Sequence, residues 1–286
     1  MRAVLICPAE RPAVAFFAQA MPLVTVPLLG ESLVSYWMEW LAEHGFDEVV
    51  LLATDRPEQV RSLVGDGARW GMRAEVRAEL HEPSPIDAAA KFFNADAAVE
   101  KVFVLDHLPD CPDEQLFRSY ADWFRLALAW MPRAVSHSRV GFREVSPGLW
   151  RGLHNQIAPT AQLRSPCWIG ESVRVGQQAV IGPGAVLENR TVVDSAAEVV
   201  DSIVGPDTFV GALTKVQNSI AWGNSLINWR TDSCTVVPDA FLLSPLGQSP
   251  FCGSTPPLPN RWSGILGAVW SRPRQVLSAM KGKFLA

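Results

Sequence analysis

The sequence predicts two kinds of fold in one chain: an α/β domain first, then a parallel β-helix. In the first part, short apolar runs alternate with amphipathic stretches at helical spacing, a pattern typical of a parallel sheet covered by helices on both faces. From residue 157 onward an aliphatic residue returns at every sixth position, which indicates a solenoid of short strands. A chain of 286 residues has room for both folds.

The first strand and the first helix are predicted near the start of the chain. Residues 3–7 (AVLIC) form a continuous apolar run ended by Pro8, as expected of a strand buried on both faces. A loop is expected to follow. Residues 31–44 (ESLVSYWMEWLAEH) predict an amphipathic helix, with Ser32 in the N-cap position and Gly45 just past its end.

The same alternation of strand and helix continues beyond this helix. Residues 49–53 (VVLLA) predict a second buried strand, and Thr54 or Asp55 opens a second helix. Residues 86–101 are helical in composition and lead into a strand at 102–105 (VFVL). Strands that alternate with helices need parallel crossovers, so ligands are expected at the carboxyl ends of these strands.

A hexapeptide repeat defines the second half of the chain. Its leading positions are Ile157, Leu163, Ile169, Val175, Ile181, Leu187, Val193 and Val199, and after the loss of one residue Val204, Val210, Val216 and Trp222. The leading side chains are expected to point inward, and the small fifth residues to form corners. Three hexads for each triangular coil give about four coils. Trp222 is too large for a narrow interior and is predicted to mark the end of the stack.

Composition and charge exclude several classes of protein. With 48% hydrophobic and 19% charged residues the chain is not disordered. No apolar run reaches the roughly 18 residues of a spanning helix, and the first run is too short for a signal peptide, so a cytoplasmic location is expected. The five cysteines are scattered without metal-ligand or redox spacing and are expected to be reduced thiols.

Charge is distributed unevenly along the chain. The net charge is −4, but residues 261–286 hold five basic residues and no acidic one, which leaves −9 on the rest. An acidic body argues against nucleic acid as a partner, because phosphate binding needs a basic stripe on the folded surface. The basic and apolar tail at 261–286 predicts either peripheral contact with an anionic membrane or a terminal helix that covers the β-helix or a sister subunit.

Several segments, taken in order, resemble the sugar-1-phosphate nucleotidyltransferases, or nucleotide-sugar pyrophosphorylases, that carry a left-handed β-helix. MRAVLI resembles the opening strand of that family, and MPLVTVPLLGESLVSYWMEWLAEHGFDEVVLLAT its next loop, helix and strand. VFVLD resembles its metal-binding strand, and GLWRG with IAPTAQL resembles the entry to its β-helix. The resemblance implies a shortened nucleotidyltransferase-like α/β domain at 1–147 and a left-handed β-helix at 148–245. The composition of residues 246–286 predicts a Pro-rich linker and a basic tail.

The resemblance also implies where a site would lie. Arg11, in the loop after the first strand, and Asp87, in the segment that reads the base, are the candidate nucleotide-binding residues. Asp106, at the end of the third predicted strand, is the candidate metal ligand. The resemblance therefore implies Mg²⁺ as a cofactor if the protein is active, and no cofactor otherwise.

The chain departs from the family where phosphate is handled. The family closes backbone amides of a Gly-rich loop around the triphosphate, but no glycine precedes Gly30 in this chain. Met21 stands where the family has a Lys, and a thioether cannot neutralise phosphate charge. Only about 40 residues, with one helix expected near 113–131, separate Asp106 from Gly148, where the family builds its sugar pocket.

These departures favour a catalytically silent relative. The predicted role is a regulatory or scaffold subunit in nucleotide-sugar or surface-polysaccharide synthesis, with a nucleotide or nucleotide sugar as a ligand. The expected assembly is a homo-oligomer or a complex with a biosynthetic enzyme.

Two enzymatic alternatives stay open. One is an active nucleotidyltransferase that uses Arg11 for phosphate and Asp106 for magnesium. The other is a hexapeptide-repeat acyltransferase with a histidine as general base. None of the five histidines is expected within a coil, and His154, just before the first hexad, lies nearest to one.

Overall fold

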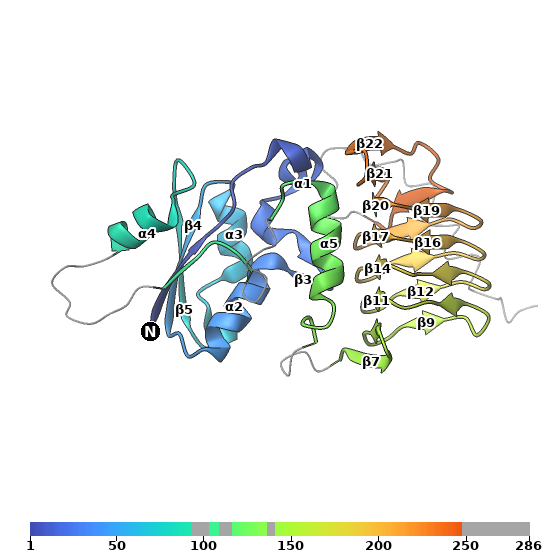
Figure 1. The fold of residues 1–286 in the computed structure, drawn as a ribbon, viewed down its shortest axis with the longest axis horizontal. Helices are drawn as coiled ribbons and strands as arrows, with labels where there is room; N and C mark the ends of the chain where they lie inside the picture. The colour runs from blue at the N-terminus through green and yellow to red at the C-terminus, as the bar shows by residue number, and fades with distance from the viewer. Residues whose placement is uncertain (93–102, 109–115, 136–140, 248–286) are drawn as a thin grey trace, which may run out of the picture. The chain divides into compact units, whose positions relative to one another are not determined.

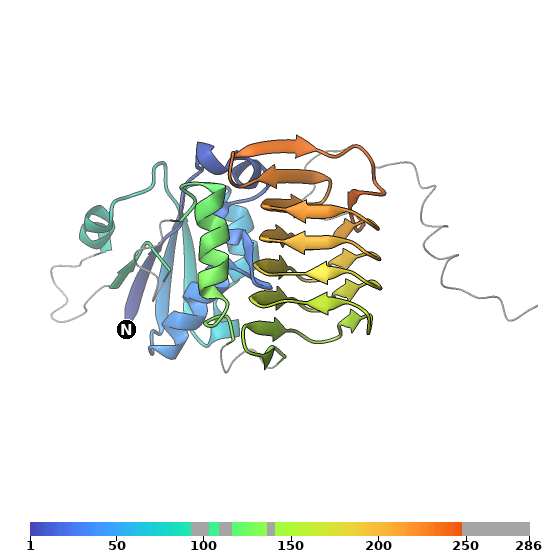
Figure 2. The same ribbon diagram turned by 45° about the vertical axis from the view of Figure 1, so that its right-hand side comes forward.

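The computed structural model describes residues 1–92, 103–108, 116–135 and 141–247, whose elements Figures 1 and 2 show along the chain. Met1–Phe251 form one compact unit. The predicted basic tail at 261–286 lies outside the described residues. Among the described helices, none has the length and apolar character that crossing a bilayer requires.

The first part of the chain contains a four-stranded parallel sheet. Its strands are β1 (Arg2–Ile6), β4 (Glu48–Ala53), β5 (Arg73–Ala78) and β6 (Phe103–Leu105). They lie in the order β5-β4-β1-β6, and all neighbouring pairs are parallel. The predicted strands at 3–7, 49–53 and 102–105 are therefore confirmed. Strand β5 was not predicted, because charged residues alternate along it on an exposed edge.

Helices cover both faces of the sheet. Ala3 and Leu5 of β1 pack in one core cluster with α2 (Leu33–Glu43) and α3 (Pro57–Val64). Val4 and Ile6, on the opposite face, pack with α4 (Pro85–Phe92). Figure 1 shows α4 on one side of the sheet and α2 with α3 on the other. Successive side chains of β1 point to opposite faces of the sheet, so one apolar strand contributes to two cores.

The helix ends are partly as predicted. Ser32 caps α2 by accepting from the backbone N–H of Ser35, and Gly45 follows the helix with a φ of +73°. The N-cap of α3 is Arg56, with a φ of 41°, and not Thr54 or Asp55 as predicted. Arg56 holds this position through its own side-chain contacts, described below.

The loop expected after β1 contains short helices. The 3₁₀ turn η1 (Pro12–Val14) leads into α1 (Ala15–Ala20), and η2 (Leu23–Thr25) precedes the hairpin of β2 (Pro27–Leu28) and β3 (Glu31–Ser32). A further turn, η3 (Ala68–Trp70), precedes β5. Helix α5 (Tyr120–Trp130) begins after its cap Ser119, later than the predicted start at 113. Apolar side chains of α1 and α5 belong to one core cluster.

The second part of the chain is a parallel β-helix of three sheets. The first contains β8 (Leu149–Arg151), β11 (Cys167–Ile169), β14 (Ala185–Leu187), β17 (Ser202–Val204) and β20 (Ser219–Trp222). The second contains β9 (Gln156–Ile157), β12 (Arg174–Val175), β15 (Val192–Val193) and β18 (Thr208–Val210). The third contains β10 (Gln162–Leu163), β13 (Val180–Ile181), β16 (Glu198–Val200) and β19 (Lys215–Gln217).

Antiparallel strands close the ends of the stack. β7 (Arg143–Ser146) pairs with β8 at one end, and β21 (Ser225–Asn228) with β22 (Ser233–Val236) follows β20 at the other. β23 (Leu243–Pro245) pairs with β18. Figure 2 shows the successive coils stacked between these closing strands.

The strand register confirms the hexapeptide repeat. Gln162 pairs with Val180 and Val180 with Glu198, each 18 residues on, which is three hexads for each coil. Glu198 pairs with Lys215, only 17 residues on, because of the residue lost after Val199. The leading aliphatics and the small fifth residues share one buried interior cluster. The hand of the coil stays a prediction.

Two details of the repeat differ from the prediction. Ala221, and not Trp222, stacks on Val204 in the interior, so the indole of Trp222 points outward. The first coil begins with β8, so His154 lies within it, at the corner between β8 and β9. The repeat predicts a first coil that starts only at Ile157, because no aliphatic residue leads a hexad before it. His154 was therefore expected outside the coils.

An apolar row on the outer face of the β-helix joins it to the first part of the chain. The row consists of Trp150, Trp168, Val186, Ile203 and Ile220, which follow one another up the first sheet. These side chains belong to the same core cluster as α1, α2 and α5. The two folds therefore share one core within the compact unit.

Candidate functional site

The carboxyl ends of the parallel strands are the expected place for a ligand. In an open α/β sheet ligands bind where neighbouring connections leave in opposite directions. β4 lies on one side of β1 and β6 on the other, so this point falls at the carboxyl ends of β1 and β6. The candidate site is therefore formed by the residues after Ile6 and after Leu105.

Arg11 lies at this edge, paired with a carboxylate of its own chain. Its Nη2 donates to Oε1 of Glu82 at 2.8 Å, and the backbone N–H of Ala9 donates to Oε2 at 3.0 Å. Glu82 comes from the loop between β5 and α4. The Arg11 and Glu82 side chains are 36% and 30% exposed. The donors after β1 thus already bind the Glu82 carboxylate. No local sequence pattern indicates this contact, because Glu82 lies far along the chain.

Cys7, the first residue after β1, is fully buried next to this contact. Burial raises the pKa of its thiol to about 12, and the negative charge of Glu82 adds to the shift. Cys7 therefore stays a neutral thiol near pH 7 and is not a nucleophile there.

Asp106 follows β6, as predicted, and contacts the next residue in the chain. Its Oδ1 lies 2.7 Å from Nδ1 of His107, and both side chains are 45% exposed. Across the described ranges, no group of three His, Cys, Asp or Glu side chains could hold a metal ion. A magnesium site needs several oxygen ligands. Within the described residues, Asp106 and its neighbours do not fit the Mg²⁺ site that the resemblance implies.

Asp87 lies in the first turn of α4, next to the cap residue Ser84. The Asp87 carboxylate accepts from the hydroxyl of Ser84 at 2.7 Å, and the Asp87 backbone N–H donates to the hydroxyl oxygen of Ser84 at 3.2 Å. Ser84 therefore caps the start of α4, and Asp87 holds its hydroxyl in place. No hydrogen bond or ion pair within the described residues joins Arg11, Asp87 and Asp106 to one another.

Arg56 is a residue of this edge that was not predicted. Its guanidinium donates to Asp55 at 2.8 and 2.7 Å and to the carbonyl oxygens of Ala18 and Gln19 at the end of α1. The hydrogen bond with Asp55 raises the pKa of Arg56. Arg56 thus fastens the loop after β4 to α1. The signal of this role is the left-handed backbone conformation of Arg56, a residue with a long side chain. This conformation is not visible in a sequence.

His154 occupies a corner of the β-helix. Its φ is +58°, and Ser172, Arg190 and Asp207 take the same left-handed conformation at the matching corner of the next coils. His154 is exposed. Its position is thus explained by the geometry of the turn. His137, another of the five histidines, lies outside the described residues.

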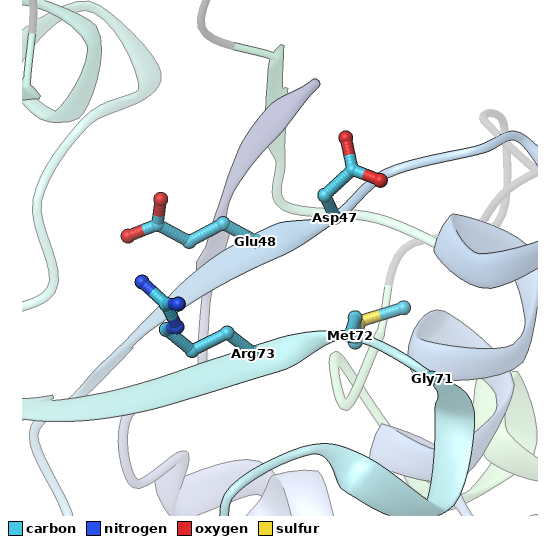
Figure 3. A pocket seen from close by; sticks show the side chains of 5 residues that line it. All are labelled: Asp47, Glu48, Gly71, Met72 and Arg73. Carbon is cyan, nitrogen blue, oxygen red and sulfur yellow. The ribbon is translucent and has the colours of Figure 1, made fainter.

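A hollow lies at the opposite end of the sheet. Figure 3 shows its lining, which is Asp47, Glu48, Gly71, Met72 and Arg73. The Asp47 carboxylate lies 2.6 Å from the N-terminal amino group, and Glu48 lies 3.3 Å from Arg2. This hollow is at the amino ends of β4 and β5 and its carboxylates are paired, so it is a poor candidate for the ligand site of this sheet.

Comparison with known proteins leaves the family open. No family model and no curated protein matches the chain. One similar solved structure is a mutant of perosamine N-acetyltransferase from Caulobacter crescentus in complex with CoA and GDP-perosamine, at 15% identity. The match covers 68% of this chain and 97% of that chain, with a TM-score of 0.16, too low to indicate a shared arrangement. The resemblance to the sugar-1-phosphate nucleotidyltransferases therefore stays a prediction.

Proposed function

We propose that this chain is a nucleotidyltransferase-like protein of nucleotide-sugar or surface-polysaccharide metabolism that does not catalyse turnover and acts as a scaffold or regulatory subunit. The observation that carries the proposal is the contact at the carboxyl end of β1. There, Arg11 and the Ala9 backbone N–H are engaged by Glu82. An active enzyme of the resembled family needs such donors for the phosphates of its substrate.

The position of Met21 supports the proposal. The resemblance places a phosphate-binding Lys here, but Met21 is only 2% exposed and belongs to the apolar core. A buried thioether packs well and offers no charge to a phosphate. Met21 therefore serves packing at a place where catalysis would need a cation.

The loop after β1 supports the proposal in the same way. Phe17, on α1 within this loop, is fully buried, and its ring makes edge contacts with Tyr120, Trp123 and Trp222 at centroid distances of 5.6, 6.0 and 5.4 Å. The resembled family has a Gly-rich loop here that closes on phosphates. In this chain the same segment instead packs an aromatic side chain between the sheet and the β-helix. Such a connection suits a rigid scaffold.

A turnover assay tests the proposal. The purified full chain is incubated with a panel of nucleoside triphosphates, sugar-1-phosphates and Mg²⁺, and pyrophosphate release is measured. The expected result is no release above background. Release that disappears in the Asp106→Asn variant would establish the active nucleotidyltransferase and overturn the proposal.

A second assay addresses the acyltransferase alternative. Acetyl-CoA is supplied with nucleotide sugars that carry a free amine, and the release of free CoA is followed. The expected result is no release. Release that depends on His154, measured against a His154→Ala variant, would overturn the proposal in favour of acyl transfer.

A further inference from the structure

We propose that Glu82 competes with external anions for the hydrogen-bond donors at the carboxyl end of β1. Its carboxylate occupies the Ala9 N–H and the Arg11 guanidinium, so a free anion, such as a phosphate group, binds there only after Glu82 has moved away. This inference rests on the proposed function, which places a ligand at this edge of the sheet. It adds that Glu82 regulates the access of the ligand to this edge.

The geometry of the contact is that of a bound anion. The Glu82 carboxylate faces both donors: Nη2 of Arg11 lies 2.8 Å from Oε1 and 2.7 Å from Oε2, and Oε2 also accepts from the Ala9 N–H. A guanidinium beside a backbone N–H is a donor pair that suits carboxylate and phosphate oxygens equally. Arg11 also donates to the Ala9 carbonyl at 3.3 Å, which holds its side chain next to that N–H. The donors therefore stay in place when the anion is exchanged.

The loop that carries Glu82 is held at both ends. Glu79 at its start pairs with Lys91 of α4, and Ser84 at its end donates a hydrogen bond to Asp87 in the first turn of α4. Glu82 lies between these two attachments, so its carboxylate is kept close to the donors after β1. A tethered carboxylate has a high effective concentration, which disfavours weak external anions.

The contact can nevertheless be displaced. Both side chains are about one third exposed, and a solvent-exposed ion pair of this kind adds little to stability. Glu82 carries a single negative charge, whereas pyrophosphate or a nucleotide carries several. A multivalent anion at sufficient concentration therefore replaces Glu82 at Arg11, and the loop between β5 and α4 moves as it does so.

Isothermal titration with pyrophosphate at fixed ionic strength tests this inference on the full chain. Glu82→Gln keeps the size of the side chain and removes its charge. Because the competing carboxylate is gone, we expect this variant to bind pyrophosphate at least about tenfold more tightly than the unmodified protein. Glu58→Gln is the control for a general effect of charge, since it removes one carboxylate, paired with Arg61 within α3, without touching Arg11 or the loop that carries Glu82. We expect its affinity to equal that of the unmodified protein.

A double variant identifies the receiving group. Glu82→Gln combined with Arg11→Gln is expected to lose the whole gain in affinity. Equal affinity in Glu82→Gln and the unmodified protein would overturn the inference, as would an equal gain in Glu58→Gln, which would indicate a general effect of charge. None of these outcomes changes the result that is expected in the turnover assays. Conversely, pyrophosphate release would overturn the proposed function while leaving the gain in affinity in place.

Discussion

The Glu188 carboxylate of the β-helix accepts a hydrogen bond of 2.7 Å from the backbone N–H of Leu29, in the turn between β2 and β3. Its other oxygen accepts from Gly30, also at 2.7 Å, and Glu188 itself is 2% exposed. Leu29 and Gly30 both have positive φ, as a tight two-residue hairpin turn requires, although that conformation is unfavourable for a Leu. The β-helix thus holds a strained turn of the α/β part in place.

This relationship predicts a large effect of Glu188→Gln on stability. The amide replaces one acceptor oxygen by a donor that faces a backbone N–H, so one buried N–H loses its partner. We expect the free energy of unfolding in urea to fall by about 1–3 kcal/mol. Glu43→Gln, on the exposed side of α2, is the control and should stay within about 0.5 kcal/mol. An equally small effect of Glu188→Gln would show that this carboxylate does not hold the turn.

A second prediction concerns the contact between Gly205 and Trp222. A Cβ on Gly205 would lie 2.6 Å from the Trp222 ring, which Phe16 and Phe17 hold in edge contacts. Gly205→Ala should therefore lower the free energy of unfolding by about 1–3 kcal/mol.

The partner variant makes this second prediction specific. In a Trp222→Leu background the ring that blocks the new methyl group is gone, so Gly205→Ala should cost much less. Thermal and urea unfolding of the two single variants and the double variant measure this coupling. Strictly additive effects would contradict the proposed clash.

The repeat was predictable because each coil imposes the same demand on the sequence. An interior wide enough for one aliphatic side chain selects Val, Ile or Leu at every sixth position, and that selection is visible without a structure. The position of Trp222 was not predictable by extending the period, because the coil shortens before it and Ala221 takes the inward place. The outer row that includes Trp150 and Trp168 recurs every 18 residues in the first coils and every 17 in the later ones, a signal that is present in the sequence but did not enter the prediction.

The candidate site was less predictable because its contacts join distant parts of the chain. Arg11 could be placed in the loop after β1, but its partner Glu82 lies 71 residues further on. Asp106 was placed correctly at the end of β6, whereas its pairing with His107 depends on side-chain conformation. A local pattern identifies which element a residue follows and does not identify which carboxylate a loop brings to it.

A third prediction tests the capping role of Asp87. If Asp87 and Ser84 cap α4, then Ser84→Ala and Asp87→Asn should each lower the free energy of unfolding by about 0.5–1 kcal/mol. The double variant should cost less than the sum of the two, because the two side chains share one interaction. Urea unfolding measures all three variants. A loss of nucleotide or pyrophosphate binding in Asp87→Asn, with unchanged stability, would instead support a role in binding.

A fourth prediction follows from the two buried thiols, Cys7 and Cys167. Burial raises the pKa of each to about 12, from an ordinary value near 9. The folded protein therefore keeps a proton that the unfolded chain releases above pH 9. The resulting stability is fully present below pH 9 and is lost as the pH rises toward 12.

Cys167→Ala isolates one of these contributions. Alanine fits this position, because Ala185 stacks directly on Cys167 in the next coil. Between pH 9 and pH 10.5 the free energy of unfolding of the unmodified protein should fall by about 1.6 kcal/mol more than that of Cys167→Ala. Urea unfolding at several pH values measures the two slopes. Parallel slopes would show that the Cys167 thiol ionises as easily in the folded protein as in the unfolded chain, which its burial in the interior of the β-helix argues against.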